Sequence, residues 1–232
     1  MKIIIVPGLS SPYCDQQKPV YGPLLNETSR LFPQARAEVI LLPGQSDARG
    51  HTEGEFLIPE ATGQLRSVIE SEKTEEHFLI ARSSGCTVVA ELLATWKDAP
   101  VKKVVFWGPP PFLLYYDMFA SGEGPFYEKA HKTGVQITKR ILINCTPWES
   151  NIAKFSQRLL IATGSKDMFS PPSYLDYVFT LESLAHRIPT VEHNTVENCP
   201  HGVTPDMPCW TDYCQCILGW LRQDIPTHTS GN

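Results

Sequence analysis

The stretch that most constrains how this chain can fold runs from Phe78 to Leu93. Residues Phe78 to Ala81 form a short apolar run typical of a strand, and Gly85 to Leu93 is apolar almost all round, as in a helix buried against a sheet. A strand can turn into a helix across one residue only if the positions two before and two after it carry small side chains. Ala81 and Gly85 meet this requirement. The sequence therefore predicts a sharp turn that exposes the Ser83 hydroxyl at a helix N-terminus, where free backbone N–H groups stabilise negative charge.

This turn resembles the nucleophile elbow of the α/β-hydrolase family, which usually reads Gly-x-Ser-x-Gly. Ala81 replaces the first glycine here, and Cys86 stands where a second glycine often follows. The same five residues would also suit a polar turn without a catalytic role. The interpretation therefore depends on an acidic residue and then a histidine downstream, each in a loop after a strand.

Two later loops supply these residues. The loop after a predicted strand at 158–162 resembles the family's Gly-x-x-Asp-x-x-x-Pro loop, which implies that Asp167 is the acid that orients the histidine. His201 precedes the last predicted helix, where the resemblance places the general base. Asp117 and His193 are the competing candidates. The order Ser83, Asp167, His201 is that of α/β-hydrolases, and the elbow and residues 3–8 are also similar to those of the small serine hydrolases related to retinoblastoma-binding protein 9.

Strands and helices alternate along the chain, which predicts right-handed βαβ units and a parallel sheet. With the resemblance, this implies an α/β-hydrolase fold: a mostly parallel sheet of about six strands flanked by helices. The predicted strands cover 2–6, 37–42, 78–81, 101–107, 158–162 and 187–192, and helices are expected near 22–32, 61–69, 85–93, 172–185 and 209–221.

An insertion is expected after the strand that ends at Trp107, because residues 108–157 are far more than the ~2 to 6 residues of an ordinary connection. The resemblance implies that 108–157 is a cap and that 1–107 and 158–223 form the hydrolase core. Residues 224–232 are expected to be a disordered tail, as chain ends often are. Within the cap, Thr146 to Glu149 is a capping-box pattern with proline at the first helical position. It predicts a helix from Pro147 to about Ser156.

The resemblance also implies which groups surround the serine. The backbone N–H groups of Leu9 and Ser84 are the expected oxyanion hole. Arg82 is expected either to meet an acidic group of the substrate or to serve as a structural ion-pair partner. The aromatic residues either line an acyl-binding pocket or pack the cap's own core; those assigned to the pocket are Trp107, Phe112, Tyr115 and Tyr116.

Composition excludes several other classes of function. The 232 residues carry a formal net charge of −5 with acidic and basic residues mixed, so no basic patch indicates nucleic acid. The apolar run at 3–6 is too short for a signal peptide, and no stretch approaches the ~20 apolar residues of a membrane span. A cytoplasmic protein with reduced cysteines and no membrane partner is therefore expected.

Four of the seven cysteines lie near the C-terminal end, namely Cys199, Cys209, Cys214 and Cys216. On a helix over 209–221, Cys214 and Cys216 would lie about 200° apart and could not hold one ion together. We therefore interpret the four as core residues, and expect neither a metal nor a cofactor.

The sequence thus favours a serine hydrolase that cleaves small-molecule carboxylic esters or thioesters, with an apolar group, through an acyl-enzyme. Two alternatives stay open: a non-catalytic small-molecule-binding protein, and a lyase or cofactor-free oxygenase on the same fold. The acyl group, the leaving group and the oligomeric state are not specified by the sequence.

Overall fold

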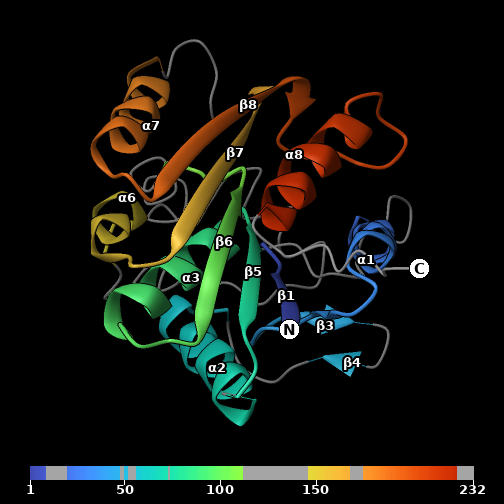
Figure 1. Ribbon diagram of the computed structural model, residues 1–232, viewed down its shortest axis with the longest axis vertical. Helices are drawn as coiled ribbons and strands as arrows, with labels where there is room; N and C mark the ends of the chain where they lie inside the picture. The colour runs from blue at the N-terminus through green and yellow to red at the C-terminus, as the bar shows by residue number, and fades with distance from the viewer. Residues whose placement is uncertain are drawn as a thin grey trace, which may run out of the picture.

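A six-stranded parallel sheet forms the centre of the protein in the computed structural model (Figure 1). The structure describes residues 1–8, 20–47, 50–51, 56–72, 74–111, 146–167 and 175–223, without the side chains of 46–47, 50–51 and 175–180. The strand order is β2-β1-β5-β6-β7-β8, and each neighbouring pair is parallel. The strands are β1 Lys2–Val6, β2 Arg36–Val39, β5 His77–Arg82, β6 Val101–Trp107, β7 Arg158–Lys166 and β8 Val191–Pro200. A short antiparallel pair, β3 Ser46–Asp47 and β4 Gly50–His51, lies outside this sheet.

Helices cover both faces of the sheet (Figure 1). One face carries α1 Tyr21–Leu31 and α8 Trp210–Arg222, and the other carries α2 Ile58–Ser71, α3 Ser84–Thr95, α6 Trp148–Asn151 and α7 Leu175–Arg187. Successive strand residues point to opposite faces, so Ile3 and Ile5 pack toward α1 and α8 while Ile4 and Val6 pack toward α2 and α3. Burial on both faces explains why this strand is a continuous apolar run. The predicted fold class, a mostly parallel sheet of six strands between helices, is confirmed.

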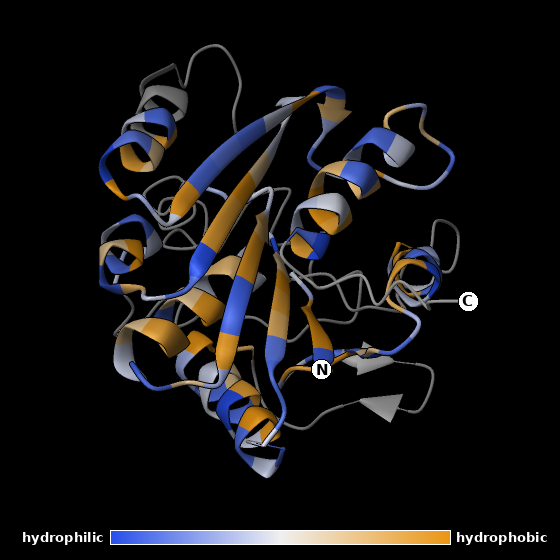
Figure 2. Ribbon diagram, in the orientation of Figure 1, coloured by the Kyte–Doolittle hydropathy of each residue, from blue (hydrophilic) through white to orange (hydrophobic). Residues whose placement is uncertain are grey.

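Three strands differ in extent from the prediction. β2 ends at Val39 rather than Leu42. β7 continues four residues beyond Ala162, and β8 starts at Val191 and runs to Pro200, so that residue 187 ends α7 instead of starting a strand. β8 is the edge strand, and Figure 2 shows it as mostly hydrophilic, unlike the central strands. Because one face of it is partly exposed, its polar residues resemble a loop in the sequence although they pair with β7.

The helix predicted from Pro147 to about Ser156 is present, but it begins one residue later and is shorter. Pro147 has φ −49° and ψ 127°, so it precedes the helix, which begins at Trp148. After four residues it passes into a 3₁₀ turn over 152–154. The Trp148 ring is buried and donates a hydrogen bond to the Pro110 carbonyl at 2.8 Å, which ties this helix to the residues after β6.

The end of the predicted cap is part of the hydrophobic core. Trp148, Ile152 and Phe155 are buried in the cluster shared with α2 and α3, and the rings of Trp148 and Phe155 both meet Phe106 edge to face. The rest of the predicted cap, residues 112–145, and the predicted disordered tail, 224–232, lie outside the described residues.

No helix in the described part of the chain is long and apolar enough to cross a membrane.

Candidate active site

Ser83 lies in the one-residue turn between β5 and α3. Its backbone angles are φ 51° and ψ −122°, a conformation that costs a non-glycine residue about 1–3 kcal/mol. The turn is held because the Ser83 N–H donates to the Trp107 carbonyl at 3.0 Å. A Cβ on Gly85 would lie 2.5 Å from the Val6 carbonyl oxygen, so no other residue fits there. The small residue that the sequence analysis required at this position thus has a measurable steric cause.

The three predicted triad residues meet at the carboxyl end of the sheet. The His201 Nδ1 lies 2.9 Å from the Asp167 Oδ2, and the His201 Nε2 lies 3.1 Å from the Ser83 Oγ. A carboxylate can only accept, so Nδ1 carries the proton and Nε2 of the neutral ring accepts from the serine hydroxyl. Asp167 directly follows β7 and is 3% exposed, while His201 directly follows β8. The geometry is that of a serine nucleophile, its base and the acid that orients the base.

A glycine that the sequence analysis had not placed at the site makes room for this pair. Gly108, directly after β6, has φ +56°, and a Cβ there would lie 3.2 Å from the His201 Nδ1 and 3.3 Å from the Asp167 Oδ2. The signal was available, because Gly108 ends a strand next to the elbow strand. Its importance depends on residues 59 and 93 positions further along the chain, which sequence spacing does not bring together.

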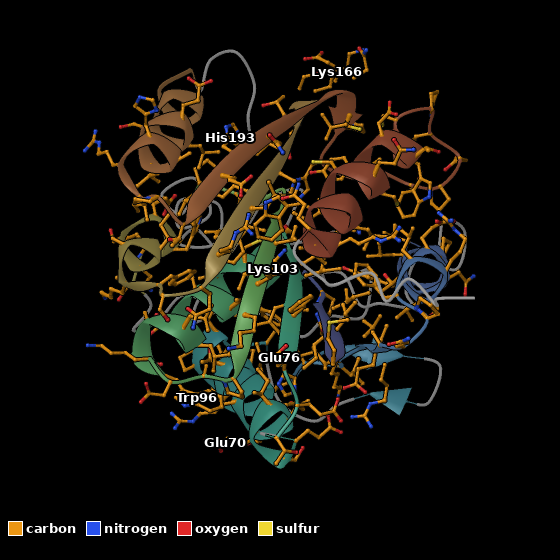
Figure 3. All side chains as sticks on the ribbon, in the orientation of Figure 1. Glu70, Glu76, Trp96, Lys103, Lys166 and His193 are labelled. Atoms are coloured by element: carbon orange, nitrogen blue, oxygen red, sulfur yellow. The ribbon has the colours of Figure 1, made fainter. Side chains whose placement is uncertain are left out.

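The competing histidines do not reach the serine. His193 lies within β8 (Figure 3), where its Nε2 shares a hydrogen bond of 3.0 Å with the Thr163 hydroxyl. Burial lowers the pKa of His193. His77 begins β5, at the opposite end of that strand from Ser83. The competing candidate for the acid, Asp117, lies outside the described residues.

Of the two predicted oxyanion-hole groups, the structure describes Ser84, the first residue of α3, and does not describe Leu9. The N–H groups of a first helical turn have no partner within the helix. The Ser84 hydroxyl is fully buried and has no hydrogen-bond partner among the described residues. The first backbone N–H groups of α3 therefore lie next to Ser83.

The residues predicted to line the substrate pocket have different positions in the structure. Trp107 is 1% exposed and packs against Trp210 and Tyr213, so it is a core residue. Arg82 is partly exposed, and its guanidinium carbon lies 4.8 Å from the Trp107 ring centre and 5.7 Å from that of Tyr21. No carboxylate pairs with Arg82 in the part of the chain that the structure covers. The other three pocket predictions, Phe112, Tyr115 and Tyr116, lie outside the described residues.

The C-terminal cysteines pack in the core, as their spacing predicted. Cys199, Cys209 and Cys214 are buried and Cys216 is partly buried, all as free thiols. Burial raises the pKa of Cys214 to about 12 and also raises the pKa values of Cys199 and Cys216, which keeps these thiols protonated. Among the described residues, no group of three or more histidine, cysteine or acidic side chains could hold a metal ion.

Comparison with solved structures identifies the fold. A bromoperoxidase from Bacillus anthracis is 18% identical with a TM-score of 0.67, and the match covers 95% of this chain and 91% of that one. A monoacylglycerol lipase from Paleococcus ferrophilus is 16% identical with a TM-score of 0.67, over 95% of this chain and 93% of that one. An esterase from Exiguobacterium antarcticum is 14% identical with a TM-score of 0.67, over 96% and 92%.

The chain therefore has the α/β-hydrolase fold. At these identities the likeness establishes the fold and nothing finer. No protein-family model matches the sequence, and comparison with curated protein sequences found no match either.

Proposed function

We propose that this protein is a serine hydrolase that cleaves carboxylic esters or thioesters carrying an apolar group. The observation that carries the proposal is the hydrogen-bonded series from Ser83 through His201 to Asp167, with Ser83 on a strained turn at the start of α3. Strain of this kind persists only when the surrounding packing enforces it, and it is common at catalytic sites. The esterase and lipase among the similar structures agree with such an activity.

In the proposed mechanism the Ser83 Oγ attacks the substrate carbonyl while the His201 Nε2 takes its proton. The buried Asp167 accepts the Nδ1 proton's hydrogen bond and stabilises the imidazolium that forms. The backbone N–H groups of Ser84 and Leu9 stabilise the oxyanion. His201 then protonates the leaving alcohol or thiol, and a water molecule attacks the acyl-enzyme to release the carboxylic acid and regenerate Ser83.

The first test is labelling with a fluorophosphonate, with the adduct located by mass spectrometry. We expect wild-type protein to be labelled on Ser83, Ser83→Ala to take no label, and His201→Ala to react at least about a hundred-fold more slowly. Ser67→Ala, on the exposed face of α2, is the matched serine control and should be labelled as the wild type is. A folded wild-type protein that takes no label would favour a non-catalytic binding protein.

Product analysis tests the reaction class. A hydrolase incorporates one oxygen atom from ¹⁸O-water into the released acid, whereas a lyase or an oxygenase does not produce that acid by hydrolysis. A series of p-nitrophenyl esters of increasing chain length then tests the apolar group. We expect kcat/KM to rise from acetate to a medium-length chain.

Arg82 suggests a further property of the substrate, namely an acidic group. Its positive charge lies between two aromatic rings beside the nucleophile, and no described carboxylate neutralises it. We propose that it favours substrates that also carry an acidic group. The replacement Arg82→Gln should lower kcat/KM for a hemisuccinate ester relative to the matched neutral ester. An unchanged ratio would remove acidic substrates from the proposal.

A further inference from the structure

The backbone at Gly8 touches the nucleophile turn. Gly8 follows β1, and a Cβ built on it would lie 2.9 Å from the Ser83 Cβ and 3.1 Å from the Arg82 carbonyl oxygen. A glycine is therefore needed for this loop to approach the serine. The next residue is Leu9, whose N–H is one of the two proposed oxyanion donors.

Both polar backbone groups of Gly8 are held by side chains from other parts of the chain. Its N–H donates to the Tyr21 hydroxyl of α1 at 3.3 Å. Its carbonyl accepts a hydrogen bond of 2.6 Å from the Gln45 Nε2, which reaches it from the loop after β2. Gly8 is thus fixed from two sides.

Gln45 is itself fixed. Its side chain is fully buried, and its Oε1 accepts the Leu42 N–H at 3.0 Å. The backbone N–H of Gln45 donates to the Leu42 carbonyl at 3.1 Å. A buried amide with both ends bonded has one orientation, because turning it over would place donors against a donor and an acceptor against an acceptor. The Nε2 therefore faces the Gly8 carbonyl.

The Gly8 carbonyl belongs to the peptide group that joins Gly8 to the next residue, and Gly8 lies against the Ser83 turn. Because a peptide group is rigid and planar, a hydrogen bond to its carbonyl restrains the whole group. We propose that Gln45 is a positioning residue of the proposed oxyanion hole, because it holds the Gly8 carbonyl beside the Ser83 turn; this rests on the proposed hydrolase function.

The chain offers a matched control. Gln64 on α2 donates from its Nε2 to the Leu41 carbonyl, also at 2.6 Å, so it anchors the loop after β2 with the same kind of bond but does not reach Gly8. Gln45→Glu keeps an oxygen for the Leu42 N–H and replaces the donor toward Gly8 with a carboxyl oxygen. Gln45→Met removes both bonds without adding a charge, and Gln64→Glu and Gln64→Met are the corresponding controls.

The experiment measures kcat and KM on a p-nitrophenyl ester, the second-order rate of fluorophosphonate labelling, and the melting temperature of each variant. Loss of one oxyanion donor costs about 10²–10³-fold in kcat, so misaiming it should cost about 10–100-fold. We expect this loss in both Gln45 variants with KM changed less than about threefold, and a parallel loss in labelling rate. Both Gln64 variants should keep kcat within about twofold.

Each outcome separates the inference from the proposed function. Equal kcat in the Gln45 and Gln64 variants, or a Gln45 effect confined to KM, would overturn the positioning role while the hydrolase proposal stands. A kcat loss that merely follows the loss of folded protein, as the melting curves would show, would also overturn it. A folded wild-type chain with neither turnover nor label would refute the hydrolase proposal, and the inference with it.

Discussion

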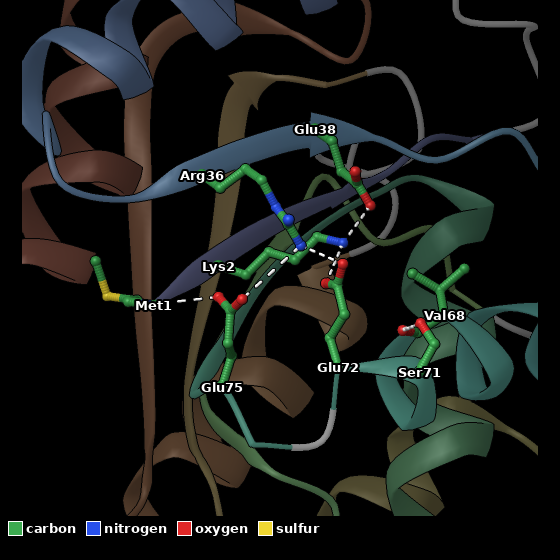
Figure 4. A network of polar contacts seen from close by, with 8 residues as sticks. All are labelled: Met1, Lys2, Arg36, Glu38, Val68, Ser71, Glu72 and Glu75. Atoms are coloured by element: carbon green, nitrogen blue, oxygen red, sulfur yellow. Dashed lines mark hydrogen bonds and ion pairs between the residues drawn. The ribbon is translucent and has the colours of Figure 1, made fainter.

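At the amino-terminal end of the sheet charged side chains pair with opposite charges, whereas at the carboxyl-terminal end a strained turn and a guanidinium without an ion pair among the described residues lie near the His201–Asp167 pair. The amino-terminal group is shown in Figure 4. Lys2 is 3% exposed and lies 2.7 Å from Glu38 and 2.6 Å from Glu72, and Arg36 pairs with Glu72 and, at 3.9 Å, with Glu75. Hydrogen bonds from Lys2 and Arg36 lower the pKa of Glu72.

The carboxyl-terminal end is organised differently. Ser83 and Gly108 both have positive φ angles, and Gly85 and Gly8 allow backbone contacts that a Cβ would block. The guanidinium of Arg82 stacks on rings without an ion pair among the described residues. The strained backbone and the guanidinium without an ion pair lie at one end of the sheet, while paired charges and apolar strands stabilise the rest of it. Mutations at the two ends should therefore separate stability from activity.

The largest contrast is expected for Ser83→Gly. Activity should fall by at least about 10³-fold, because the proposed nucleophile is lost. The free energy of unfolding should rise by about 1 kcal/mol, because glycine adopts the positive φ without strain. Ser67→Gly in the regular helix α2 should instead lower it by about 0.5 kcal/mol. Urea unfolding measures the change in stability of both variants. A lower free energy of unfolding for Ser83→Gly would contradict the strain assigned to this turn.

Gly108→Ala should lower both the activity and the stability. The added Cβ pushes against the His201 to Asp167 pair, so we expect kcat to fall about 10–100-fold, as for a small misplacement of catalytic groups. The positive φ should cost about 1–2 kcal/mol of stability. Gly63→Ala on α2, where a Cβ meets nothing within 4 Å, should leave kcat unchanged and add up to about 1 kcal/mol. Equal kcat values for the two variants would show that His201 and Asp167 can accommodate a Cβ at position 108.

Lys2→Met should affect stability alone. It leaves Glu38 and Glu72 without their buried partner, and because both carboxylates are partly exposed we expect a loss of about 2 kcal/mol rather than the ~3–5 of a fully buried pair. Arg66→Met, which breaks the exposed pair with Glu70, should cost less than about 0.5 kcal/mol. A change in kcat on Lys2→Met would mean that the two ends of the sheet are coupled.

The smallest effect concerns pH. Burial lowers the pKa values of His77 and His193 in the folded protein, so the unfolded chain takes up protons first as the pH falls. The contribution of these histidines is complete above about pH 6.5 and is lost below it, with a limiting slope of about 1.4 kcal/mol per pH unit for each proton. His77→Phe should reduce the slope between pH 6.5 and 5 in urea unfolding experiments. The lowered pKa of Glu72 acts in a separate window, below about pH 4.5. An unchanged slope would show that His77 is not kept neutral.

The sequence sufficed for the elements whose signals are local. Apolar runs predicted the five strands β1, β2, β5, β6 and β7, whereas the strand expected at 187–192 shares only two residues with β8. The small residues around Ser83 predicted the turn, because a steric requirement two residues away is visible in the sequence. Strand ends were less predictable. β8 contains polar residues because it is the edge strand, so its extent was not visible as an apolar run. The capping pattern predicted the helix near Pro147 to within one residue of its start, but not its short length or its change to a 3₁₀ turn.

By itself, the sequence determined the strand-turn-helix at Ser83, the alternation that implies a parallel sheet, and the order of serine, acid and histidine, since each depends on neighbouring residues or on chain order. Only the tertiary structure decided that His201, rather than His193, meets Ser83, that Gly108 leaves room for His201 and Asp167, and that Gln45 holds the Gly8 carbonyl. These contacts join residues tens of positions apart. Their geometry follows from the register of the parallel strands and the packing of the loops after them, which no local pattern encodes.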